Sequence, residues 1–163
     1  MMTLKNFLAL IFGWYAQDIV QIMMTQTFLA PEIYLMMLIW CVTQEKQLSV
    51  PWRWFAAALC GGLLMDLRWI GVPGLYGALY TAAVLVAHWA WFQIPAANRR
   101  TLPYVVITTS LCAVMTLSRL LFWDTGVLAG RMGLVIGVQW IANAVVLTFS
   151  ALLRFHLHDD QSF

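Results

Sequence analysis

Four ionisable side chains interrupt long apolar stretches of this sequence: Asp18, Glu32, Asp66 and Arg119. An ionisable group within the hydrocarbon region of a membrane costs a few kcal/mol or more. Each of these side chains is therefore expected to face other helices or water rather than lipid. Groups of this kind form ion pairs, proton relays or ligand sites, so we take the four as candidate functional residues.

Arg119 is the one basic residue placed deep within a predicted span, and its partner should be an acid at similar depth. Asp66 and Arg119 both lie toward the outer ends of their spans, which predicts an Asp66–Arg119 pair. The alternative is that Arg119 snorkels to the surface. Gly62 lies on the same helical face as Asp66 and allows a neighbouring backbone to approach closely. Asp66 is expected either to bond to the following loop or to bind a partner directly.

A polar stripe is predicted on the first span, because Asp18, Gln21 and Thr25 are spaced by three and four residues. Trp14 continues the same stripe. We expect this stripe to face another helix rather than lipid. The alternative is that it lines a cavity.

Glycines recur at four-residue spacing in residues 126–130 and again at Gly133 and Gly137. This spacing allows close crossing of two helices in a membrane. Only the second pair lies within a predicted span. Gln139 and Asn143 follow on the same helix, where they can form hydrogen bonds across an interface.

The sequence contains no pattern typical of an enzyme or of a metal or cofactor site. A nucleophile elbow, a metalloprotease motif and a phosphate-binding loop are all absent. The cysteines lack metal-ligand spacing and are interpreted as small buried hydrophobes: Cys41, Cys60 and Cys112. His88 is expected to be a hydrogen-bonded core or interfacial residue, with a proton relay as the alternative. His156 and His158 are assigned to a solvated tail; the alternative is weak metal binding together with Asp159 and Asp160.

Composition and hydropathy predict that the chain is almost entirely embedded in a membrane. Of its 163 residues 63% are hydrophobic and 10% are charged, whereas about 25% are charged in a soluble domain. The net charge of +2 gives no support for a nucleic-acid partner. About 20 apolar residues cross a bilayer as a helix. We therefore predict an all-α integral membrane protein with six transmembrane helices, forming a single domain over residues 1–163: residues 4–24, 28–43, 50–67, 72–94, 102–123 and 132–153.

The first span is interpreted as retained rather than as a cleaved signal peptide. The second is the weakest, because it is short and contains Pro31 and Glu32; a broken or re-entrant start is the alternative.

Positive charges divide unevenly between the two predicted surfaces. One surface receives Lys5, Lys46, Arg53, Arg99, Arg100 and Arg154, and the other receives Arg68 and Arg131. The positive-inside rule then places both termini in the cytoplasm.

Three short segments resemble MreD, a rod shape-determining membrane protein of bacteria. They are residues 31–35 (PEIYL), 61–67 (GGLLMDL) and 71–74 (GVPG). The resemblance covers residues 28–92 by motif and the remainder by hydropathy and length. The chain departs from the family in having Glu32 where Asp is more usual, in its tight connection at residues 68–74, and in Arg119, which belongs to no family pattern.

The resemblance implies a non-enzymatic scaffold of the cell-elongation and peptidoglycan-synthesis machinery in the bacterial inner membrane. Its implied partners are the single-span protein MreC, the actin-like MreB, the polymerase RodA and a class B penicillin-binding transpeptidase, besides membrane lipid. The family fold is similar to the six-helix substrate-binding subunits (S-components) of energy-coupling-factor transporters. The alternative function is therefore a solute-binding transport subunit, with Asp18, Gln21, Trp14, Asp66 and Arg119 available to line a pocket. An ion channel has less support, because these residues do not form a pore-lining ring.

Overall fold

The computed structural model describes residues 4–24, 29–45, 52–69, 73–122 and 132–159. These ranges form six α-helices and one short 3-10 helix, with no strand among them, so the all-α prediction is confirmed. The elements are α1 (Leu4–Met23), α2 (Ile33–Thr43), α3 (Trp52–Trp69), α4 (Leu75–Gln93), η1 (Ala96–Asn98), α5 (Thr101–Phe122) and α6 (Met132–Asp159).

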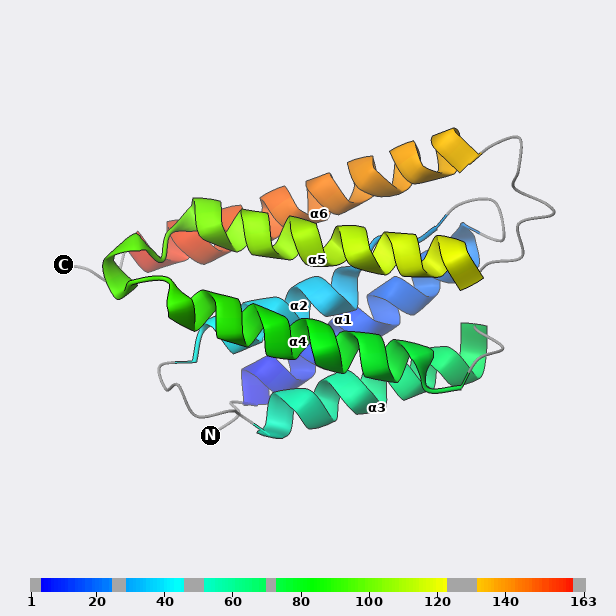
Figure 1. The fold of residues 1–163 in the computed structure, drawn as a ribbon, viewed down its shortest axis with the longest axis horizontal. Helices are drawn as coiled ribbons and strands as arrows, with labels where there is room; N and C mark the ends of the chain where they lie inside the picture. Colours follow the sequence, from blue (N-terminus) through cyan, green and yellow to red (C-terminus); the bar gives the residue numbers. More distant parts are fainter. Residues whose placement is uncertain (1–3, 25–28, 46–51, 70–72, 123–131, 160–163) are drawn as a thin grey trace.

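The helices lie side by side along one long axis, as Figure 1 shows. α1 begins and α6 ends at the end of the bundle where α4 passes through η1 into α5. We call this the η1 end and the opposite one the outer end. α2 lies at the centre and contacts each of the other five α-helices. Its core side chains are completely buried: Leu35, Leu38, Ile39 and Val42.

Three helices are long and apolar enough to cross a membrane: Leu75–Gln93, Thr101–Arg119 and Gly133–Leu152. These helices indicate a membrane protein. α2 has 11 residues and is therefore about 16 Å long, roughly half of a 30 Å hydrocarbon core. That α1, α2 and α3 also cross the membrane stays a prediction.

Two predicted spans have different limits in the structure. The second was predicted over residues 28–43, with a broken start as the alternative. Helix begins only at Ile33, because Glu32 is a non-helical N-cap with φ −80° and ψ 56°, and Pro31 disfavours helical conformation at the residue before it. The last span was predicted over residues 132–153, which agrees with the apolar stretch Gly133–Leu152, although α6 continues as a helix to Asp159. No proline or glycine follows Arg154 to end it.

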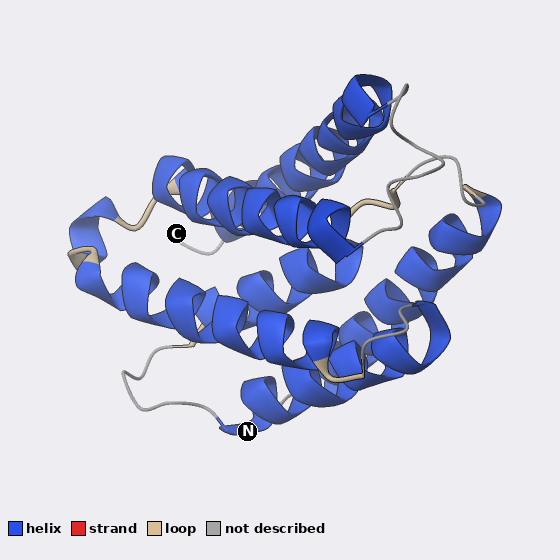
Figure 2. Cartoon of the chain, turned by 45° about the vertical axis from the view of Figure 1, so that its right-hand side comes forward, coloured by secondary structure: helices blue, strands red, loops and turns tan. Residues whose placement is uncertain are grey.

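α3 and α4 make the most extensive helix–helix contact among the described residues. A Cβ atom on Gly62 would lie 2.6 Å from the backbone of Gly77, so only glycine fits there. Gly62 thus makes the close approach predicted for it. Gly133 and Gly137 do not, since a Cβ atom on either would meet nothing within 4 Å. Both glycines are exposed, on a different face of α6 from the buried Gln139 and Asn143, so no described helix packs on them. That a further helix packs there stays a prediction. Figure 2 shows the N-terminal half of α6 diverging from α5.

Candidate functional site

Buried, non-helical backbone leads into α2 near the outer end of the bundle. In this lead-in (residues 29–32) every residue is buried, and Ala30 and Glu32 are 0% exposed. Non-helical backbone at membrane depth needs hydrogen-bond partners within the protein. The Ala30 carbonyl accepts hydrogen bonds from Nη1 of Arg119 at 3.1 Å and Nε2 of Gln139 at 3.5 Å. The Glu32 amide donates to Oδ1 of Asn143 at 2.9 Å. Side chains of α5 and α6 therefore replace the missing helical hydrogen bonds.

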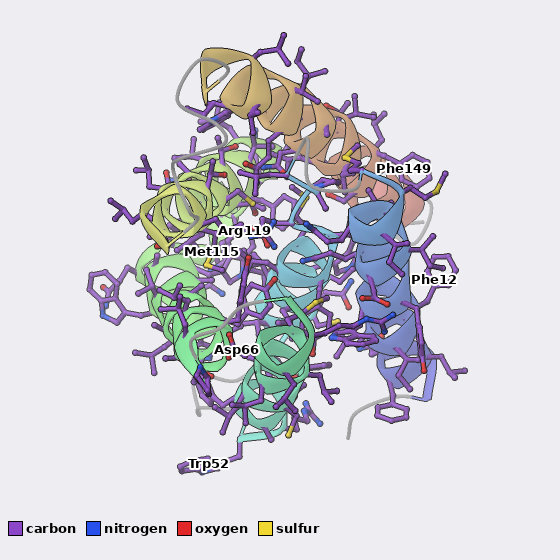
Figure 3. The ribbon with its side chains drawn as sticks, turned by 90° about the vertical axis from the view of Figure 1, so that its right-hand side faces the viewer. Phe12, Trp52, Asp66, Met115, Arg119 and Phe149 are labelled. Carbon is purple, nitrogen blue, oxygen red and sulfur yellow. The ribbon has the colours of Figure 1, made fainter. Side chains whose placement is uncertain are left out.

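The Glu32 carboxylate is held by charge and by a hydrogen bond. Its Oε1 lies 2.9 Å from Nε of Arg119, and its Oε2 accepts a hydrogen bond from the Tyr80 hydroxyl at 3.0 Å. The Arg119 guanidinium also lies over the ring of Tyr76, 4.9 Å from its centroid. Figure 3 shows Arg119 pointing into the interior between the helices. The two buried charges compensate each other, as buried charges in a low-dielectric interior must.

Gln17 joins α1 to the same cluster. Its Nε2 donates to the Tyr80 hydroxyl at 3.0 Å, and its Oε1 accepts from the amide of Tyr34 at 2.8 Å. That amide lies in the first turn of α2, where backbone N–H groups have no partner within the helix. We call the connected side chains the polar cluster; its members are Gln17, Glu32, Tyr80, Arg119, Gln139 and Asn143. The polar cluster links four helices to the lead-in of α2.

Asp66 on α3 supplies the N-terminal cap of α4. The N-cap residue Gly74 has no side chain, and its φ of 88° favours glycine. Asp66 instead accepts hydrogen bonds from the amides of Tyr76 at 2.8 Å and Gly77 at 3.2 Å. These are the second and third residues of the helix, whose amides an N-cap side chain ordinarily satisfies. A carboxylate also interacts favourably with the N-terminal end of the helix dipole.

The predicted Asp66–Arg119 pair is therefore wrong: Arg119 pairs with Glu32, and Asp66 caps α4. The prediction failed because it chose Asp66 for its similar depth to Arg119 and did not consider Glu32 as the partner. In the structure the lead-in is buried, so Glu32 lies within reach of Arg119. Gln17 and Tyr80 were missed altogether, although a polar side chain within each apolar span was a usable signal.

The polar stripe of α1 contacts α3 through two of its members. Oδ2 of Asp18 lies 2.9 Å from Nη1 of Arg68, and Nε1 of Trp14 donates to the Gly61 carbonyl at 3.1 Å. Gln21 is half-buried, and Thr25 lies outside the described residues. These two contacts agree with the expectation that the stripe faces another helix.

The remaining candidates from the sequence are the histidines and the cysteines. His88 is buried, and its ring lies 4.7 Å from that of Phe92; the side chains of His156 and His158 lie outside the described residues. Cys41 and Cys112 are buried as expected, but Cys60 is exposed, because it lies on an outer face of α3. Among the described residues no group of three or more potential ligands could hold a metal ion. The described side chains of the site thus do two things: Glu32 and Arg119 balance each other's charge, and Asp66 caps the backbone at the start of α4.

Comparison of the chain with protein-family models, with curated proteins and with solved structures finds no match.

Proposed function

We propose that this protein is a non-enzymatic scaffold of the bacterial inner membrane that holds a single-span partner of the cell-elongation machinery against its helices. The MreD-like segments include the residues that make the specific contacts described above: Glu32, Gly61, Gly62, Asp66 and Gly74. The resemblance thus lies in residues that build the bundle. On this proposal MreC is the direct partner, with RodA, the class B transpeptidase and MreB in the wider assembly.

The observation that carries the proposal is the open glycine face of α6. Gly133 and Gly137 have space beside them, and Leu134 and Ile141 are 57% and 68% exposed on the same helix. Glycines at this spacing allow a second transmembrane helix to approach to backbone contact. A scaffold for single-span proteins needs such a face.

The proposal includes six membrane crossings with both termini in the cytoplasm. α1 has 20 residues and α3 has 18, close to the length of a membrane-spanning helix. α2 is extended by its lead-in, whose backbone is satisfied by the polar cluster. α1 begins and α6 ends at the same end of the bundle (Figure 1), as an even number of crossings requires.

The test is affinity purification of the tagged full-length protein from its native membrane in mild detergent, with mass spectrometry of retained proteins. We expect an MreC-like single-span protein, or the RodA and transpeptidase pair. Gly133→Leu combined with Gly137→Leu should abolish retention, because the added side chains fill the open face. Ala82→Leu, at an exposed position of α4, is the matched control and should retain the partner. Recovery of nucleotide-binding subunits, or equal retention by both variants, would overturn the proposal.

The transport alternative gains no specific support from the site. The charged residues suggested to line a solute pocket are each engaged within the chain. Asp18 pairs with Arg68, Asp66 caps α4, and Arg119 pairs with Glu32.

A further inference from the structure

α5 and α6 are consecutive helices, and together we call them the α5–α6 hairpin. Their inner faces carry many buried polar side chains. Six of the twelve buried polar side chains that the structure describes lie on them: Thr108, Thr116, Arg119, Gln139, Asn143 and Ser150. Thr108 and Thr116 donate to carbonyls of their own helix, so they add no bond between helices. Ser150 likewise donates to a carbonyl of its own helix. The polar side chains left to bond outside the hairpin are Arg119, Gln139 and Asn143.

The hairpin is attached differently at its two ends. At the η1 end the chain turns tightly, and Nε of Arg99 donates to the carbonyl of Ile94 at 2.9 Å. Beside this turn Tyr104 is completely buried. The hairpin packs on α4 through α5 and on α2 through both of its helices, and it makes little contact with α1 or α3. Figures 1 and 2 both show the N-terminal half of α6 diverging from α5 toward the outer end.

Polar contacts join the hairpin to the lead-in of α2 near the outer end. Arg119 reaches the Glu32 carboxylate and the Ala30 carbonyl, and Gln139 and Asn143 bond to the same short stretch of backbone. Only the Glu32–Arg119 contact joins two full charges. Among the described contacts, this ion pair is therefore the one charged link between the hairpin and the rest of the bundle near the outer end.

We propose that the α5–α6 hairpin is a hinged arm that pivots at the η1 end, and that the Glu32–Arg119 ion pair is the latch that holds it closed. In the open state Arg119, Gln139 and Asn143 separate from the lead-in, and water from the outer surface reaches the polar faces. The closed state described here is the latched one. This inference does not rest on the proposed scaffold function.

The test measures distances by double electron–electron resonance on the full chain in lipid nanodiscs. Spin labels replace Met23 on α1 and Leu134 on α6, both exposed near the outer end, in a background where the exposed Cys60 is changed to serine. The latched protein should give one main distance. Glu32→Gln removes the charge but keeps the shape, and it should raise the population at longer distance about fivefold or more, as ordinary allosteric couplings do. Arg119→Gln should do the same.

A second label pair separates arm opening from general loosening. Met23 and Leu67 lie on α1 and α3, outside the hairpin, and their distance should be the same in all three proteins. Unchanged Met23–Leu134 distances in either variant would overturn the proposal. So would an equal change in the Met23–Leu67 distance, since the ion pair would then hold the whole bundle rather than an arm.

Discussion

Arg119 and Glu32 form an ion pair in the interior near the outer end of the bundle, with Nε and Oε1 separated by 2.9 Å and side chains that are 6% and 0% exposed. Neither side chain reaches water, so each charge depends on the other for compensation. The same two residues also hold the non-helical lead-in of α2. A charge that would be costly alone thus secures a buried segment whose backbone lacks helical hydrogen bonds.

Glu32→Gln should lower the free energy of unfolding by about 3–5 kcal/mol, because it leaves the buried Arg119 charge uncompensated. Thermal unfolding in detergent, followed by circular dichroism, measures this loss. Arg100→Gln also removes one charge, but its side chain is exposed, so its unfolding temperature should match that of the unaltered protein. Equal unfolding temperatures for Glu32→Gln and the unaltered protein would contradict the compensating role.

Tyr80→Phe should cost about 1–3 kcal/mol, since the hydroxyl donates to Glu32 and accepts from Gln17. A double-mutant cycle with Gln17→Leu gives the coupling directly. Side chains in one hydrogen-bond network show a coupling energy of about 0.5–3 kcal/mol in such a cycle. Strict additivity in the same unfolding assay would indicate that the two side chains do not share a network.

Asp66→Ala should cost about 0.5–2 kcal/mol, the usual loss for removing an N-cap side chain. The effect should be local, because Asp66 bonds only to the first turn of α4 in the contacts described above. Hydrogen–deuterium exchange should show faster exchange at the amides of Tyr76 and Gly77, with the middle of α5 unaffected. Uniformly faster exchange in both helices would show that Asp66 stabilises the bundle as a whole.

Hydropathy was enough to predict the helices, because apolar stretches of about 20 residues have few alternatives in a membrane. Gly62 was also predictable, since glycine beside a carboxylate on one helical face indicates close packing. The partner of Arg119 was not, because the depth of Glu32 depends on where α2 begins. The capping role of Asp66 depends on the turn at Gly74, and sequence spacing alone does not give the direction in which α4 leaves that turn.

Gly62→Ala and Gly133→Ala make the same chemical change on two helices and should have opposite effects. At Gly62 the new Cβ would lie 2.6 Å from the Gly77 backbone, so α3 and α4 must separate, at a cost of about 1–3 kcal/mol. At Gly133 the new Cβ meets nothing within 4 Å, and alanine favours helix over glycine by about 0.5–1 kcal/mol. The isolated Gly133→Ala protein should therefore unfold at a slightly higher temperature than the unaltered one.

Partner binding should reverse the benefit of Gly133→Ala. If a partner helix packs on the glycine face, a methyl group there reduces affinity even though it stabilises the isolated chain. Measuring both unfolding and co-purification on this one variant separates the two effects. Higher stability with weaker retention is the expected result. Higher stability with full retention would place the partner on another face, and lower stability would show that α6 packs more closely along Gly133 than the described contacts indicate.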